Sequence, residues 1–457
     1  MKFHTNITTG KAMNRQAEKF YQMAAGMTRT LLWSFLGFSI ILLSSDLLKA
    51  QMQIPAPEQD SPIALQGGTI HTISGGVIEN GTVLFEDGVI TAVGVNIEIP
   101  EGANVVDVNG KEIYPGLIDA YNQMGLYEIG AVNMTLDLNE QGLVNPNVMP
   151  EVAFNPESRH IGVARSNGVL VTVSSPAGGL VSGQSSALMM EGWSWEEMLI
   201  KSGTGLLVNW PSPGNEDDYE EGLQMLRNTF DAARAYKTAR KAMDEGEAPR
   251  HDLDTRWESM IPVFEGERPV VVNANDLRQI QDAITWSEEE GLRLIILGGR
   301  DAHLVASHLV RNEIPVIVTS VLTSPSRSWE PYDGRYNLPA KLHDAGVTFA
   351  IAGGSSAAYA NRLPYEAGAA AAYGLDYDEA LRSVTLSPAE ILGFDDRVGS
   401  IQAGKDATLM ITTGNPLEYS TRIEQAFIQG RKVDMIDAHR FFYEKYREKV
   451  NQRAESR

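Results

Sequence analysis

Apolar runs of the β type alternate with helical stretches through the middle of this chain, and that alternation constrains the fold more than any other feature. It is typical of a parallel sheet with crossover helices. The runs that we interpret as strands lie around Ile118 and at 169–173, 187–190, 206–208, 269–272, 294–297, 316–318 and 347–351. No glycine-rich phosphate-binding turn follows the first run, so we predict a closed (β/α)8 TIM-like barrel in preference to an open doubly wound sheet.

Helical patterns separate these runs. The clearest lie at 219–243, 276–291, 301–311 and 338–345, and Gly291 and Gly346 stand where two of them would stop. The segment from about 215 to 267 is rich in Glu, Asp and Lys. We interpret it as a solvent-exposed acidic helical insertion in a barrel that occupies 114–395.

Short strand-like segments punctuated by glycine flank the barrel region on both sides, at 61–113 and at 396–434. An Asp87-Gly88 pair between apolar alternations indicates a hairpin. Neither set is large enough to bury its own face. We therefore predict one discontinuous β-sandwich built from both ends of the chain. The tail at 435–457 is interpreted as an amphipathic helix lying on the domain, with a free partner-binding helix as the alternative.

Charge and cysteine content exclude several classes of function. The 457 residues carry a formal net charge of -21, which argues against nucleic-acid binding because phosphate contacts need clustered Lys and Arg. There is no Cys, so thiolate nucleophiles, Cys-zinc sites and disulfides are excluded. A hydrophobic fraction of 43% is ordinary for a folded protein.

The apolar run at 31–43 follows Arg29 and precedes a polar, small-residue region. That layout predicts a signal peptide over 1–50, cut after Ala50 and followed by a linker at 51–60. An uncleaved anchor or a buried helix is the alternative, and translation from Met27 would shorten the long basic region. We expect an exported protein, periplasmic or secreted, with no membrane span after cleavage.

Three stretches resemble one known family. The sequence YPGLIDAYNQ at 114–123 resembles the first barrel strand of the amidohydrolase superfamily, and LSPAEILG at 386–393 with RVGSIQAGKDA at 397–407 resembles its exit from the last barrel helix into the returning sandwich strand. The segment 176–197 is similar to the imidazolonepropionase-like branch. The resemblance implies the same barrel and composite sandwich, and a hydrolase acting on C–N bonds with zinc or another divalent metal.

The same resemblance implies metal ligands that this sequence lacks. Family members hold the metal with His-x-His on strand one, His on strands five and six, and Asp on strand eight. The matching positions here are Tyr121, Gln123, Asn273, Gly298 and Gly354. Glycine has no side chain, and amides and phenols are weak zinc ligands. We therefore expect no metal cofactor.

Neutral polar and aromatic groups remain at the predicted mouth of the barrel. The pocket candidates are Tyr121, Gln123, Asn273, Asn275, Trp210, Ser355 and Asp301. Such groups can hold sugars, amides or peptides through paired hydrogen bonds, or can fill the pocket themselves. Asp301 is expected to cap the helix that follows it, and Asp119 to bond the backbone. A proton-transfer role for either carboxylate, and a nucleophilic role for Ser355, are the alternatives.

Three functions fit these expectations. The first is a binding or partner subunit without the catalytic metal, forming a homo-oligomer or a hetero-oligomer with a metal-competent paralogue. The second is hydrolysis of a C–N bond, as in a cyclic amide, through unorthodox ligands. The third is a structural role in the cell envelope. A small-molecule ligand is compatible with the first two.

Overall fold

A computed structural model describes residues 54–250 and 252–455, and the segment from Ile54 onward forms one compact unit. The predicted signal peptide lies outside the described residues. In the part that is described, no helix is long and apolar enough to cross a membrane.

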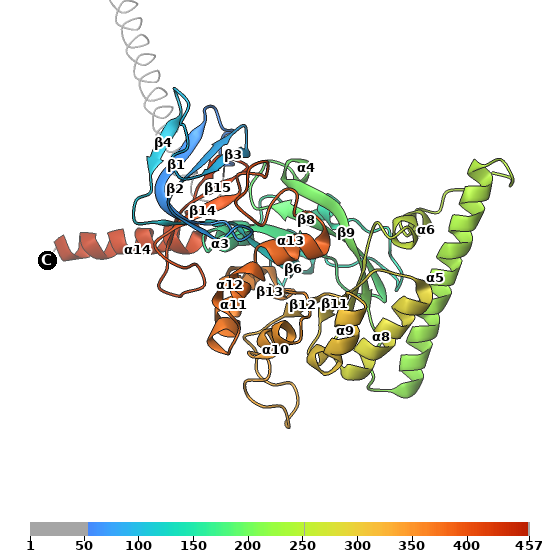
Figure 1. The fold of residues 1–457 in the computed structure, drawn as a ribbon. Coiled ribbons are helices and arrows are strands. Elements are labelled where there is room, and N and C mark those ends of the chain that lie inside the picture. Colours follow the sequence, from blue (N-terminus) through green and yellow to red (C-terminus); the bar gives the residue numbers. More distant parts are fainter. Residues whose placement is uncertain (1–53, 251, 456–457) are drawn as a thin grey trace, which may run out of the picture. The chain divides into compact units, whose positions relative to one another are not determined.

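The barrel sheet contains, among the described residues, the eight strands that the sequence predicts (Figure 1). They are β6 (Leu117–Asn122), β7 (Val169–Ser174), β8 (Val181–Met189), β9 (Leu199–Asn209), β10 (Val270–Ala274), β11 (Leu294–Gly298), β12 (Val316–Thr319) and β13 (Phe349–Ala352). Their spatial order follows the chain. The predicted α/β barrel class is therefore confirmed.

One strand departs from the expected parallel arrangement. β8 pairs antiparallel with both β7 and β9, whereas the other neighbouring pairs are parallel. The connection from β7 to β8 covers only 175–180, and a parallel crossover needs about a dozen residues or more. The chain must therefore turn back, and the start of β8 joins the strand ends at the mouth.

The ring is nearly closed between β6 and β13, the first and last strands. They share no backbone ladder among the described pairs, yet the Asp119 carboxylate accepts a hydrogen bond from the Gly353 N–H at 3.1 Å. The Gln123 N–H likewise donates to the Ser355 carbonyl at 3.0 Å. The seam is therefore bridged at the carboxyl ends of the two strands, on the side of the mouth.

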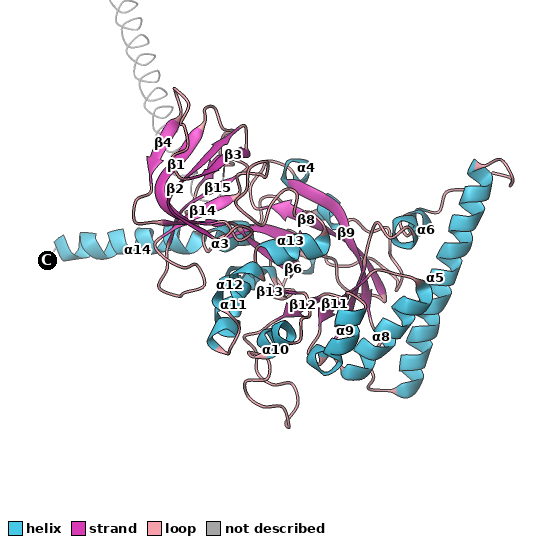
Figure 2. Ribbon diagram, in the orientation of Figure 1, coloured by secondary structure: helices cyan, strands magenta, loops and turns pink. Residues whose placement is uncertain are grey.

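Helices cover the outside of the barrel (Figure 2). Those after β9 are α5 (Glu216–Asp244), α6 (Thr255–Glu258), α7 (Ile261–Phe264), α8 (Leu277–Glu290), η3 (Ala302–Val305), α9 (Ala306–Arg311), α10 (Leu338–Asp344), η4 (Ala357–Arg362), α11 (Leu363–Ala372), α12 (Tyr377–Arg382) and α13 (Leu386–Leu392). The earlier ones are short: η2 (Asn133–Thr135), α2 (Pro150–Ala153), α3 (Arg159–Arg165) and α4 (Trp195–Met198).

The long helix α5 differs from the predicted exposed insertion. Its first half buries Tyr219, Leu226 and Phe230 in the layer between strands and helices. Beyond Ala233 none of its side chains is buried. The first half of α5 is thus the crossover helix between β9 and β10, and its charged residues lie on the solvent face of an amphipathic helix.

The second sheet combines strands from both ends of the chain, which confirms the composite domain. It contains β1 (Ile63–His71), β2 (Val77–Glu86), β3 (Val89–Gly94), β4 (Asn104–Asp107), β5 (Glu112–Pro115), β14 (Leu409–Thr412), β15 (Ile423–Ile428) and β16 (Arg431–Val433). β14 pairs with β5, and a bridge between Val89 and Asp406 brings the β3 edge to the returning chain. Tyr114 and Pro115 belong to this sheet, so the barrel begins at Leu117.

Two apolar layers fix the barrel. Inside it, side chains of several strands, such as Val271 and Leu297, share one cluster with Leu392 of α13. Outside it, the alternate residues of the same strands pack against the helices. Because residues along a strand alternate between these layers, the phase of each strand decides which polar residue at its end faces the mouth.

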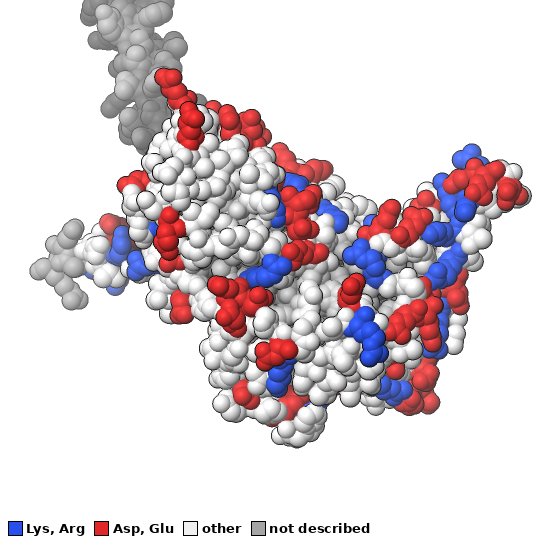
Figure 3. Space-filling view, in the orientation of Figure 1, with Lys and Arg blue, Asp and Glu red and all other residues white. Residues whose placement is uncertain are grey.

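The last helix, α14 (Ala438–Glu455), differs from the predicted helix lying on the domain. From Phe442 to Arg453 every residue of the helix is exposed. In Figure 1 it runs from beneath the second sheet to the C-terminal end. Figure 3 shows basic side chains on this helix, while acidic side chains are spread over the sheet above it.

Candidate functional site

The candidate site lies at the carboxyl ends of the barrel strands, where barrels of this type place their active sites. At the end of β6, Asp119 is fully buried and Asn122 Nδ2 donates to its Oδ2 at 2.9 Å. Burial, partly opposed by hydrogen bonds from Gly353 and Asn122, raises the pKa of Asp119 to about 7. The carboxylate therefore holds the seam of the barrel, as the expected backbone hydrogen bond implied.

A register shift in β6 sets the positions of Tyr121 and Gln123. Asp119 lies opposite Thr172, but Asn122 lies opposite Ser174, so β6 carries an extra residue there. Tyr121 packs against the inner cluster of the barrel, and burial raises the pKa of its phenol. Gln123 is 8% exposed. Both residues thus lie at the mouth end of β6.

Three asparagine side chains form a chain of amide hydrogen bonds across the next strand ends. Asn273 Nδ2 donates to Asn209 Oδ1 at 3.2 Å, and Asn275 Nδ2 donates to Asn273 Oδ1 at 3.4 Å. Asn209 Nδ2 in turn donates to the Gly179 carbonyl and to Ser182 Oγ. The structure brings the predicted Asn273 and Asn275 together, and adds Asn209.

Two glycines stand at positions where the resemblance implies metal ligands, and a polar side chain fills the space beside each of them. A Cβ on Gly298 would stand 2.6 Å from Asn275 Oδ1, and a Cβ on Gly354 would stand 2.9 Å from Ser320 Oγ. Both glycines have positive φ angles, 93° and 92°, which side chains rarely adopt. The Asn275 and Ser320 side chains therefore occupy the space that a residue at either position would need.

The donor set at the mouth does not fit a divalent cation. Its members are neutral amides, a phenol and hydroxyls, several of which already bond one another, and such groups are weak ligands for zinc. Among residues 54–250 and 252–455, no group of three or more His, Asp or Glu side chains is placed to share an ion. The donors at the mouth are thus the weak zinc ligands that the sequence indicated. The absence of a metal stays a prediction.

Asp301 belongs to a network of charges beside the mouth. It occupies the N-cap position of η3 as expected, but its side chain makes no cap hydrogen bond there. Instead its Oδ2 accepts from the Leu277 N–H at 3.0 Å and from Arg327 Nη2 at 2.7 Å. Arg327 Nη2 also donates to Asp276 Oδ1 at 2.5 Å. The carboxylate therefore ties α8 to the loop after β12.

Arg300 and Glu330 complete this network. Arg300 pairs with Asp276, and its Nε lies 3.6 Å from Glu330 Oε1. Glu330 Oε2 accepts the Ser326 N–H at 2.8 Å within the loop after β12. Sequence reasoning missed Arg327 because it lies 26 residues from Asp301 and no local pattern pairs them.

Two other candidates lie differently from expectation. Trp210 is 5% exposed, its Nε1 donates to Tyr219 OH at 3.1 Å, and its ring meets Trp286 edge to face at 5.6 Å. Its ring therefore belongs to the packing between β9 and the helices and does not line the mouth. Ser355 is exposed in the turn after β13, and its carbonyl accepts the Gln123 N–H.

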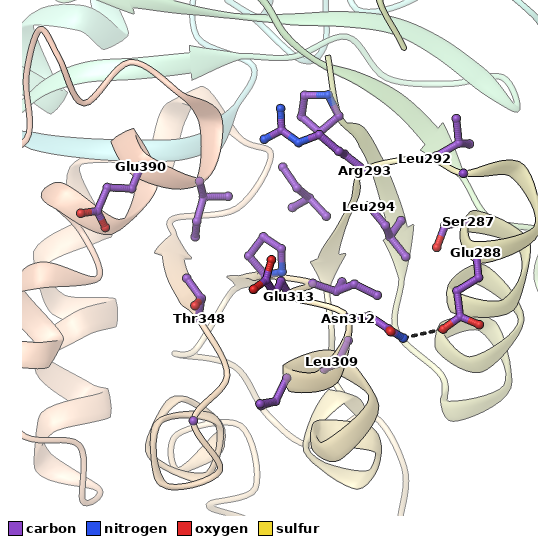
Figure 4. A pocket seen from close by; sticks show the side chains of 18 residues that line it. Ser287, Glu288, Leu292, Arg293, Leu294, Leu309, Asn312, Glu313, Thr348 and Glu390 are labelled. Atoms are coloured by element: carbon purple, nitrogen blue, oxygen red, sulfur yellow. Dashed lines mark hydrogen bonds between the residues drawn. The ribbon is translucent and has the colours of Figure 1, made fainter. Parts of the chain in front are cut away.

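A cavity of about 800 Å³ opens at the opposite end of the barrel (Figure 4). Its lining includes Pro269, Arg293, Leu294 and Pro315, where β10, β11 and β12 begin. The labelled Asn312 and Glu288 are joined there by a hydrogen bond. This is the amino end of the strands. Barrels of this type place their active sites at the carboxyl end instead.

Fold and site together define a (β/α)8-barrel protein with a composite β domain and a polar mouth at the strand ends. The amidohydrolase family model matches residues 280–438. An amidohydrolase from Thermotoga maritima MSB8 is similar in structure, with a TM-score of 0.75 and 28% identity, over 81% of this chain and 99% of that one. The chain belongs to the amidohydrolase superfamily.

Two further proteins are similar. The amidohydrolase tasK of Hapsidospora irregularis is 25% identical over 393 residues, which are 77% of this chain and 39% of the relative, so the chain spans about two fifths of that relative's length. A prolidase solved with N-methylphosphonate-L-proline has a TM-score of 0.52 and 17% identity, over 82% of this chain and 100% of that one. At that identity the prolidase bears on the fold alone.

Proposed function

We propose that this amidohydrolase-superfamily protein is a binding or partner subunit whose barrel mouth does not use a catalytic metal. The proposal rests on one observation: the Asn275 side chain fills the space beside Gly298. An imidazole at position 298 would need the space that the Asn275 amide fills. The other amides at the mouth are bonded to one another, so their geometry suits hydrogen-bonded ligands better than a cation.

A buried acceptor at the same mouth supports binding over an inert, filled pocket. Asn122 is fully buried, and within the described residues its Oδ1 has no hydrogen-bond partner. An unpaired buried acceptor costs about 1–3 kcal/mol. A ligand N–H or O–H donor, or a bridging water, would remove that cost. Small amides, peptides and sugars carry such donors and are the ligand classes that we propose.

Two features support a partner role for an exported protein. In the Hapsidospora irregularis relative, more than half of the chain lies outside the matched length, so the homologous unit there is part of a larger protein. The partner that we propose is a separate, metal-competent subunit. We propose export on the apolar run at 31–43, and N-terminal sequencing of the mature protein tests it directly.

Metal analysis tests the central proposal. We expect the purified full-length protein, after dialysis against zinc, iron or manganese, to retain substoichiometric metal, while a metal-dependent amidohydrolase treated in parallel retains its ion. Tight retention of one equivalent would overturn the proposal and favour C–N bond hydrolysis through unorthodox ligands. Metal retention can be interpreted without an activity assay, because structural or catalytic zinc binds far more tightly than adventitious zinc.

A thermal-shift screen with small amides, dipeptides and monosaccharides tests ligand binding, because a ligand that binds the native state raises its apparent stability. We expect the shift to be lost in Asn273→Ala at the mouth. It should persist in Asn312→Ala, which changes an asparagine at the opposite end of the barrel. No response to any of the three classes would favour the structural envelope role.

A further inference from the structure

The C-terminal helix α14 presents a narrow seam of side chains to solvent. His439, Tyr443, Tyr446 and Val450 follow one another at steps of four, three and four residues, the spacing of the a and d positions of a coiled coil. Tyr443, Tyr446 and Val450 are 63%, 56% and 65% exposed. Together with Phe442 and Arg447 the seam lines a shallow groove of about 540 Å³.

The first turn of α14 is bonded to the residues that directly precede the helix. The Phe441 N–H donates to the Asp437 carbonyl at 2.9 Å, and Arg440 Nη1 donates to the Met435 carbonyl at 3.1 Å. The residues after them are exposed on all sides of the helix. An isolated helical stretch as short as the exposed 442–453 is marginal in water, because helices below about 12–15 residues need tertiary packing. The exposed part of α14 therefore lacks the packing that would stabilise it.

Basic side chains flank the seam. Arg447 lies over the Tyr443 ring at 5.7 Å, and Lys449 lies over the Tyr446 ring at 5.9 Å, measured to the ring centroids. In the heptad these two residues take the e and g positions, and Arg440 takes the preceding e position. The helix has five basic and three acidic residues in a chain with 59 acidic and 38 basic residues. Its flank is thus opposite in sign to the chain that carries it.

These charges argue against pairing between two copies of α14. In an antiparallel pair the e positions face each other, so Arg440 would meet Arg447 of the other copy. In a parallel pair Phe442 would face Arg447, with no opposite charges gained. Like charges at such positions disfavour a pairing, whereas acidic residues at e and g of a partner would complement them.

The width of the seam argues against a membrane surface. Helices that lie in a membrane present a broad face of Trp, Phe and Leu, whereas a stripe confined to a and d positions is typical of a helix partner. Two of the seam residues carry phenol hydroxyls, and Arg453 continues the seam beyond Val450. Phosphatidylglycerol vesicles are nevertheless a necessary comparison, because basic residues also attract anionic lipids.

We propose that α14 is a docking helix for an acidic helix of a different protein chain, one with apolar residues at its a and d positions and Asp or Glu at e and g. The proposal concerns a surface remote from the barrel mouth and does not depend on what the mouth binds. The partner helix would cover the Tyr443–Val450 seam, and its carboxylates would pair with Arg440, Arg447 and Lys449.

The test uses the purified full-length protein and two labelled synthetic helices of about three heptads, with Leu at a and d and either Glu or Lys at e and g. We expect the Glu helix to bind at least about tenfold more tightly in fluorescence anisotropy. The charge-reversed variant Arg447→Glu/Lys449→Glu should exchange this preference for the Lys helix. An exchange is a gain of binding that a misfolded helix could not produce.

A second pair of variants tests the seam itself. Tyr443→Ser/Tyr446→Ser should abolish binding of the Glu helix, whereas Glu448→Ser/Gln452→Ser should leave it unchanged. Glu448 and Gln452 bond each other on the opposite face of α14. Equal binding of the two peptides, concentration-dependent self-association in sedimentation, or binding to phosphatidylglycerol vesicles without binding to the Glu helix would each overturn the proposal.

Discussion

Replacement of Gly298 by alanine tests whether the Asn275 side chain fills the space beside Gly298. The backbone cost of a side chain at φ 93° is about 1–2 kcal/mol. The new Cβ would also stand 2.6 Å from Asn275 Oδ1, and overpacking of this kind costs about 1–3 kcal/mol. We expect Gly298→Ala to lower the free energy of unfolding by about 2–5 kcal/mol, measured from urea midpoints.

Gly346→Ala is the matched control. Gly346 has a similar φ of 78°, but a Cβ there would meet nothing within 4 Å. It should therefore show the backbone cost alone, about 1–2 kcal/mol. The double variant Asn275→Ala/Gly298→Ala should be less destabilised than the sum of its single variants by about 1–3 kcal/mol. Equal effects at Gly298 and Gly346, or strict additivity in the double variant, would refute the steric account.

Two further variants probe buried charge near the mouth. Because the pKa of Asp119 is raised to about 7, its protonated form favours the folded state, and stability should fall by about 4 kcal/mol from about pH 4 to about pH 7. Asp119→Asn should flatten that slope in urea titrations and the exposed Asp344→Asn should not; an unchanged slope would contradict the burial of the charge. Arg327→Ala removes two partly buried ion pairs, so we expect a loss of about 1–3 kcal/mol and faster amide exchange across 320–337. Lys111→Ala, which removes an exposed pair with Glu424, should cost less than about 1 kcal/mol, and equal costs would show that burial adds nothing.

Strand positions were predictable from the sequence because the barrel strands are buried on both faces and read as continuous apolar runs. The direction of β8 was not predictable from its own residues, since an apolar run fits either direction. The signal lay in its connection: residues 175–180 are too few for a crossover. The first half of α5 was wrongly predicted to be part of an exposed insertion, because its composition is charged. Composition alone does not show that its apolar residues share one face.

Strand phase explains why the site was found only in part. In β9, Leu207 belongs to the inner cluster and Val208 to the outer one. Asn209 therefore faces inward and Trp210 outward. The side chain that reaches the mouth is the Asn209 amide, one position before the Trp210 ring that the sequence analysis had placed there. Asn273 is in phase with the inward Val271, and its side chain bonds those of Asn209 and Asn275. The partnership of Asp301 with Arg327 depends on tertiary structure, and local sequence shows only the N-cap position.

At the mouth, glycines stand beside polar side chains that fill the adjoining space. Gly298 leaves room for Asn275, and Gly354 leaves room for Ser320. Asn275 then bonds Asn273, whose amide bonds Asn209. A histidine placed at position 298 would crowd the Asn275 side chain, so it would destabilise the fold unless that side chain moved. Gly298 and Gly354 are therefore each matched to the polar side chain beside them, Asn275 and Ser320.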